Sequence, residues 1–294
     1  MRGKLHRLIT IILVAILLVS GAMVFRQWQA DKKAKDEYDR LAQMASQTAE
    51  ETTTEPVAAE TEPAETEPVQ EPYVSPIDFE ALQKENPDTI GWIQIEGTQV
   101  NYPIVQGTDN DFYLNHDFNG KESIAGSIYL DFESQGDFDG RNNILYGHNM
   151  KNGTMFKDVV KYKDEAFFNE HQYFTIYTPE REIRLKAVAA YYGEAKPIVR
   201  KTRFVSQESF DAFVQEMMSP CSYAEDVQYP ARTLYTLVTC SYEINDARTF
   251  LFAVEVDEDG SEIPPDEEFQ QHMEDLVREH AEKQGKTVDN AGKQ

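Results

Sequence analysis

Hydrophobic and polar positions divide the chain into an apolar run, a polar spacer, a region of short apolar segments and an acidic tail. The apolar run, residues 8–25, contains no charged side chain and follows a short basic segment at residues 1–7. As a helix rising about 1.5 Å per residue it would span roughly 27 Å, close to the hydrocarbon thickness of a bilayer. We therefore predict a single-pass membrane anchor, with residues 1–7 in the cytoplasm and the remainder outside the cell. A cleaved signal peptide is the alternative, because Ser20-Gly21-Ala22 offers small residues for cleavage, but the length of the run favours the anchor.

Residues 26–76 are predicted to connect the anchor to a folded domain. Residues 26–44 have the charged composition of a helix next to the membrane, whereas Thr-Glu-Pro then recurs at residues 54, 61 and 66 without apolar periodicity. Such a stretch cannot bury enough apolar surface to offset its ordering entropy, and proline and like charges keep it extended. We expect a disordered spacer; a disordered tail without a spacing role is the alternative.

Residues 77–257 are predicted to form one folded domain, built mainly of β-strands. Its short apolar segments alternate as strands do, while residues 207–218 show helical spacing inside a long connection, residues 193–230. Many short strands with few helices indicate a barrel or a sandwich. Residues 258–294 form an acidic extension, in which an apolar face beginning at Phe269 predicts a helix packed on the domain or on a partner. The expected strands are residues 91–95, 100–105, 127–130, 143–146, 173–177, 183–192, 232–239 and 249–256.

Composition narrows the possible functions. The formal net charge of −24 argues against nucleic-acid binding, because phosphate backbones are bound by clustered Lys and Arg. The chain has only two cysteines, Cys221 and Cys240, too few for a disulfide framework or a cysteine zinc site. Its histidines do not have metal-site spacing with carboxylates, and no glycine-rich phosphate loop occurs, so we predict neither a metal nor a cofactor.

Three side chains near the ends of predicted strands indicate thiol-based acyl transfer. Cys240 ends an apolar strand, Arg248 follows at the next strand, and His148 closes another apolar run. A thiolate can attack a carbonyl, an imidazole can exchange protons near neutral pH, and a guanidinium can stabilise an oxyanion. The alternatives for Cys240 are a buried apolar role or a disulfide with Cys221. His116 is the main rival to His148 as the base.

Two motifs carry a resemblance to a known family. The sequence Thr-Leu-Val-Thr-Cys at residues 236–240 resembles the cysteine signature of sortases, the transpeptidases of Gram-positive cell walls. Residues 146–149, Tyr-Gly-His-Asn, resemble the histidine element of that family, and Arg248 falls at its arginine. The helix-bearing connection at residues 193–230, and a helix near Ile77 before the strands, are similar to class B sortases. The anchor and extended spacer fit the same family, so the resemblance covers the ordering of elements as well as the motifs.

The resemblance implies a closed eight-stranded β-barrel with peripheral helices and a cysteine transpeptidase activity. Cys240 would attack the threonine carbonyl of a sorting signal near the C-terminus of an exported surface protein, and a thioacyl enzyme would form. His148 would protonate the leaving amine, and Arg248 would bind the signal and the oxyanion. An amine of a peptidoglycan precursor, or a pilin lysine, would then resolve the thioacyl enzyme.

The resemblance also implies four substrate-binding residues, namely Asn110, Leu114, Thr239 and Phe204. Val238 occupies a position that is often small and polar in class B enzymes, so the groove contacts at this position are expected to differ. Three alternative functions stay open at this point. They are a pilin-polymerising sortase of the same class, a non-catalytic membrane-anchored binding module, and a cysteine peptidase that uses water.

Overall fold

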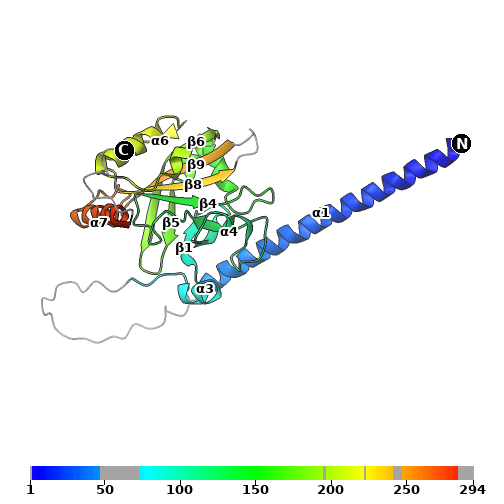
Figure 1. The fold of residues 1–294 in the computed structure, drawn as a ribbon, viewed down its shortest axis with the longest axis horizontal. Helices are drawn as coiled ribbons and strands as arrows, with labels where there is room; N and C mark the ends of the chain where they lie inside the picture. The colour runs from blue at the N-terminus through cyan, green and yellow to red at the C-terminus, as the bar shows by residue number, and fades with distance from the viewer. Residues whose placement is uncertain (1, 47–72, 195–196, 222, 241–246, 284–294) are drawn as a thin grey trace. The chain divides into compact units, whose positions relative to one another are not determined.

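The structure is a computed structural model of the chain, and it describes residues 2–46, 73–194, 197–221, 223–240 and 247–283. It contains two compact units, residues 1–40 and residues 41–294. The predicted spacer falls mainly on residues 47–72, outside the described ranges. Figure 1 shows the helices and strands along the chain.

The N-terminal apolar run is helical. Helix α1 spans Arg2–Ser46, and its stretch from Ile9 onward is long and apolar enough to cross a membrane. The apolar side chains of this stretch are exposed; Leu17, for example, has 72% of its surface accessible. Exposed leucine, isoleucine and valine on every side of a helix are compatible with a lipid environment. A single helix of this kind is compatible with the predicted anchor, and a signal sequence has the same composition.

Eight strands of the second unit form a closed barrel, which confirms the predicted fold. Each of the eight pairs with a strand on both sides, because β5 pairs with β1 and also with β6 and so joins the two ends of the sheet. The short strand β7 (Tyr223–Ala224) adds to β6 outside this ring. Around the barrel the order is β1 (Thr89–Gln94), β2 (Asn101–Val105), β3 (Ile128–Leu130), β4 (Asn142–Tyr146), β8 (Leu234–Cys240), β9 (Ala247–Glu255), β6 (Glu182–Glu194) and β5 (Tyr173–Tyr177).

Strands β8 and β9 are buried on both faces. Their alternate residues point to opposite sides of the sheet, and one set, including Leu237 and Leu251, is fully buried. The other set belongs to an apolar cluster that includes Val238 and Phe250, paired in register, together with residues of helix α6 (Gln207–Met218). The predicted helix of the long connection therefore covers the outer face of these two strands (Figure 1).

Short helices cover other parts of the barrel. The predicted helix before the strands is α3 (Phe79–Glu85), which begins where the Asp78 carboxylate accepts a hydrogen bond from the Ala81 amide. Its residues Phe79 and Leu82 are buried, and this burial explains the apolar spacing in the sequence. The others are α4 (Phe112–Asn115), α5 (Glu165–Glu170) and the 3-10 helices η1 (Asp158–Lys163) and η2 (Pro197–Arg200).

The acidic extension also forms a helix, α7 (Glu267–Lys283). Its Phe269 is buried between two guanidinium groups, 4.9 Å from Arg141 and 4.4 Å from Arg232, and Met273 is buried with it. The predicted apolar face is therefore used, at its N-terminal end, for packing on the barrel. A salt bridge of 2.7 Å between Arg232 and Asp266, just before α7, adds to the packing of Phe269.

Candidate active site

Cys240 and Arg248 face each other at the open end of the β8–β9 ladder. The carbonyl of Cys240 points away from β9, because it accepts a hydrogen bond from the Asn149 side chain, which follows β4, at 2.9 Å. In an antiparallel ladder this direction marks a non-hydrogen-bonded pair, in which opposing side chains approach most closely. The two Cβ atoms are therefore expected about 5 Å apart, with thiol and guanidinium on the same face. Both residues are half-buried.

His148 is brought to the same end of the barrel by parallel pairing. Strand β4 runs parallel to β8, with Tyr146 opposite Val238, so both strands end at one rim. The Gly147 amide continues the ladder by donating to the Val238 carbonyl at 3.2 Å. Tyr146 lies opposite Val238, so two residues further along His148 lies opposite Cys240. The imidazole and the thiol therefore lie at the same rim.

The tautomer of His148 follows from its hydrogen bond. Nε2 lies 2.7 Å from the carbonyl oxygen of Leu114, at the end of α4. A carbonyl oxygen only accepts, so Nε2 carries the proton and Nδ1 is the nitrogen that can take up another. The contact also orients the ring, since it ties the His148 segment to the α4 segment.

Gly147 is required by close packing. A Cβ atom placed on it would lie 2.5 Å from Ile128 Cδ1 and 2.7 Å from the Phe156 ring. Both neighbours are fully buried, so neither can move without disturbing the core. This explains why a glycine precedes the histidine.

Asn149 is a residue of the site that the sequence analysis did not single out. Its side chain is 2% exposed, and Nδ2 donates to the Cys240 carbonyl at 2.9 Å. This side-chain hydrogen bond takes the place of the next backbone hydrogen bond between β4 and β8. The only signal for it in the sequence is its place within the histidine element, directly after His148.

Two of the four predicted substrate-binding residues lie on the His148 side of the rim. Leu114 is 36% exposed, and its carbonyl accepts the His148 hydrogen bond. Asn110, in the loop before α4, donates from Nδ2 to Asp131 Oδ2 at 2.9 Å, and Tyr146 donates to the same oxygen at 2.8 Å. Both residues therefore connect to the segment that carries the histidine.

The other two predicted substrate-binding residues lie in the interior. Phe204 is only 6% exposed and packs against Phe210 and Phe213 with ring centroids 4.9 Å apart in each case. Thr239 is 2% exposed and, being adjacent to Cys240 in a strand, points to the opposite face of the sheet. Its neighbour across the ladder is Thr249, also buried. A direct contact of either with a signal peptide is not favoured by this placement.

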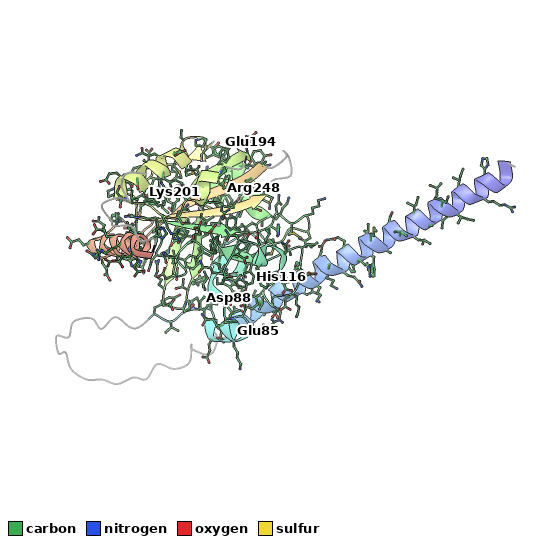
Figure 2. All side chains as sticks on the ribbon, viewed as in Figure 1. Glu85, Asp88, His116, Glu194, Lys201 and Arg248 are labelled. Atoms are coloured by element: carbon green, nitrogen blue, oxygen red, sulfur yellow. The ribbon has the colours of Figure 1, made fainter. Side chains whose placement is uncertain are left out.

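His116, the alternative base, and Cys221, the possible disulfide partner of Cys240, both make other contacts. His116 Nδ1 lies 2.7 Å from the Phe112 carbonyl, and its ring stacks on Phe112 with centroids 4.2 Å apart. In Figure 2, His116 and Arg248 lie apart on the domain. Cys221 and Cys240, both within the described chain, are not joined in a disulfide, and the Cys221 thiol donates to the Met217 carbonyl at 3.2 Å.

The phenols beside the rim are held neutral. Tyr129 and Tyr146 stack with centroids 5.1 Å apart. Burial, followed by the negative charge of Asp131, raises the pKa of both phenols far above its usual value. The two tyrosines are therefore hydrogen-bond donors throughout the physiological pH range.

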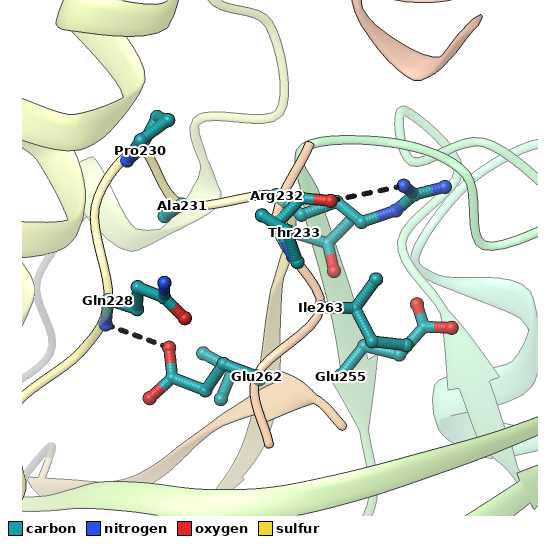
Figure 3. A pocket seen from close by; sticks show the side chains of 10 residues that line it. Gln228, Pro230, Ala231, Arg232, Thr233, Glu255, Glu262 and Ile263 are labelled. Atoms are coloured by element: carbon teal, nitrogen blue, oxygen red, sulfur yellow. Dashed lines mark hydrogen bonds between the residues drawn. The ribbon is translucent and has the colours of Figure 1, made fainter. Parts of the chain in front are cut away.

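A small pocket lies at the other end of β8, beside Thr233, which precedes the strand (Figure 3). The Gln228 amide donates to Glu262 Oε2 at 2.8 Å there, and Arg232 Nη1 donates to the Pro264 carbonyl at 3.4 Å. These bonds attach the segment after β9 to the connection before β8. Since Cys240 ends β8, the pocket is separated from the thiol by the length of the strand, and it belongs to the packing of the extension.

Comparison with known proteins gives the family. No protein-family model matches the chain. It is 34% identical to sortase B of Listeria monocytogenes over 163 residues, which cover 55% of this chain and 66% of the Listeria protein. The crystal structure of Clostridium perfringens sortase B shares 37% identity with a TM-score of 0.57, covering 60% of this chain and 99% of that one. A Staphylococcus aureus sortase B–substrate complex shares 27% identity with a TM-score of 0.65, covering 78% and 99%.

The motifs at residues 146–149 and 236–240 resemble those of the same family as these matches. These solved relatives share the fold of this chain at 27–37% identity. This chain belongs to the class B sortases, the cysteine transpeptidases of Gram-positive bacteria.

Proposed function

We propose that this protein is a membrane-anchored transpeptidase that cleaves a sorting signal on exported proteins and transfers them to a cell-wall amine. The observation that carries the proposal is that strand register brings Cys240, His148 and Arg248 to one rim, at the ends of three neighbouring strands. Sortase B of Staphylococcus aureus has been solved as a complex with its substrate, which supports substrate binding by the same fold. Helix α1 supports the anchor, and the short basic segment before its apolar stretch is the reason to place the barrel outside the cell.

In the first half of the proposed reaction, a peptide bond is exchanged for a thioester. The Cys240 thiolate forms a bond to the carbonyl carbon of the signal's threonine, and the oxyanion that develops faces the Arg248 guanidinium. Collapse of this adduct breaks the carbon–nitrogen bond. The departing nitrogen takes a proton from Nδ1 of the His148 imidazolium, because Nε2 is engaged by the Leu114 carbonyl.

In the second half, an amine replaces the sulfur. The incoming amine attacks the thioester carbon and gives a proton to His148 Nδ1, and the carbon–sulfur bond then breaks. The thiolate and the imidazolium are thereby restored together. Arg248 keeps its charge throughout and serves the oxyanion in both halves.

The decisive experiment is mass spectrometry of the full-length protein in detergent after incubation with a panel of threonine-containing sorting-signal peptides. We expect an acyl adduct on Cys240 that is absent in Cys240→Ala and present in the matched control Cys221→Ala. Absence of an adduct with every peptide would sink the proposal. A thiol inert to alkylation in the folded protein would instead favour the non-catalytic binding module.

The acceptor is tested in the same system by product analysis. Peptides carrying a lysine side-chain amine represent a pilin acceptor, and muropeptides represent the cell wall. We expect amide product with the muropeptides; amide product with the lysine peptides alone would identify the pilin-polymerising alternative. Release of free acid at every amine concentration would indicate a peptidase that uses water.

A further inference from the structure

Asp131 is a completely buried carboxylate that contacts the strand leading to His148. It directly follows β3 and is 0% exposed. Oδ2 accepts hydrogen bonds from Asn110 Nδ2 at 2.9 Å and from the Tyr146 hydroxyl at 2.8 Å, and Oδ1 accepts from the Glu133 amide at 2.9 Å. A buried carboxylate is costly unless it is hydrogen-bonded and paired, so these contacts are required for its place in the fold.

The partners of Asp131 come from three different segments around the rim. Asn110 lies in the loop before α4, and Tyr146 lies on β4, two residues before His148. Arg200, in η2 of the connection between β6 and β7, places Nε 3.6 Å from Asp131 Oδ2. Asn142 holds the same connection, since its Nδ2 donates to the carbonyls of residues 199 and 201 at 2.9 Å each. One buried side chain therefore joins the α4 loop, the strand of the histidine and the connection.

The Asn110 amide is fixed in one orientation by this arrangement. Nδ2 donates to Asp131, while Oδ1 accepts from the Phe132 amide at 3.1 Å. Rotation of the amide would place its oxygen against the carboxylate and its NH₂ against an N–H donor. One N–H of Nδ2 is used by Asp131, and the second is left to bind another acceptor.

We propose that Asp131 is a positioning residue for the sorting signal, which orients the Asn110 amide as a hydrogen-bond donor without touching the signal itself. The proposal rests on the proposed function, because it presumes that a peptide binds between α4 and β4. The ligand chemistry that it assigns is a carbonyl oxygen of the signal, in its main chain or in an amide side chain, that accepts from Asn110. An asparagine at position 131 would offer both an acceptor and a donor, so the Asn110 amide would no longer have one favoured orientation.

The test is steady-state cleavage of a fluorogenic signal peptide, the best of the panel above, by the full-length protein in detergent. Asp131→Asn is expected to raise KM about tenfold and to leave kcat within about threefold, since the hydrogen bond from the Asn110 amide to the signal is lost in binding and none is lost in the chemical step. Combining it with Asn110→Ala should add little, because both changes remove the same donor. The matched control is Asp137→Asn, an exposed carboxylate in the same loop, and it should change neither constant.

Several results would overturn the inference. An unchanged KM in Asp131→Asn would do so, and so would equal losses in kcat and kcat/KM accompanied by slower alkylation of Cys240, which would indicate a purely structural role. If Asp131→Asn does not fold, Asn110→Ala decides alone, and an unchanged KM in that variant refutes the assignment. Failure of the unmodified protein to cleave any peptide would reject the proposed function itself, which separates the two outcomes.

Discussion

Replacing Asn149 by alanine tests whether the rim is held together by a side chain. The substitution removes the donor 2.9 Å from the Cys240 carbonyl, at a site where Asn149 is 2% exposed and water has little access. A carbonyl left unpaired in such a place costs about 1–3 kcal/mol. If this cost raises the activation free energy of acylation because the thiol is misplaced, acylation slows by about 5- to 150-fold.

The assay is single-turnover acylation of Cys240, followed by mass spectrometry after rapid quenching, with thermal unfolding measured in parallel. Asn149→Asp is the sharper variant, because it is isosteric but presents an acceptor to an acceptor and a negative charge to the thiolate. It should therefore be slower than Asn149→Ala. The matched control is Asn152→Ala, an exposed asparagine in the same loop. Acylation at the unmodified rate in both Asn149 variants would refute the reasoning, whatever their stability.

Four further outcomes are expected. Gly147→Ala should lower the free energy of unfolding by about 1–3 kcal/mol in chemical denaturation, because the added methyl group overlaps buried side chains. Phe269→Ala should lower it by about 3 kcal/mol yet leave the acylation rate unchanged, because its ring packs on Arg141 and Arg232, at the opposite ends of β4 and β8 from the rim. The raised pKa of Tyr146 means that the unfolded chain loses the phenol proton first, so stability should fall above about pH 10, and less steeply in Tyr146→Phe. His148→Ala should abolish amide transfer, whereas His116→Ala should retain it.

The strands were predictable because their periodicity is local. Segments such as residues 173–177 alternate between apolar and polar residues, and the structure places β5 at the same positions. Strand β7 has only two residues and leaves no such pattern. The pairing of β4 with β8 is not readable from either segment, because it joins residues about 90 positions apart and depends on closure of the whole barrel. Only the resemblance to a family supplied that information.

The site was predictable to the extent that its chemistry lies at strand ends. Cys240 and Arg248 share a hairpin, so their proximity follows from sequence spacing alone. Asp131 was not predicted, because an aspartate in an acidic loop has the composition of a solvated residue, and only the fold places it at 0% exposure. Phe204 was expected at the groove but is buried, since a large aromatic side chain next to α6 gains more from packing with Phe210 than from exposure.

Strand parity gives the two faces of the rim different roles. Cys240 shares a face with Val238, which packs with α6 in the outer cluster, whereas Thr239 points inward with Leu237. A signal bound at the thiol therefore meets the outer cover of the barrel and not its interior. It follows that substitutions on the inner face should change stability with little effect on peptide selectivity. Substitution of Arg200, which meets Asp131 in the β6–β7 connection, should change selectivity at nearly constant stability, because an ion pair to a half-exposed arginine contributes little to folding.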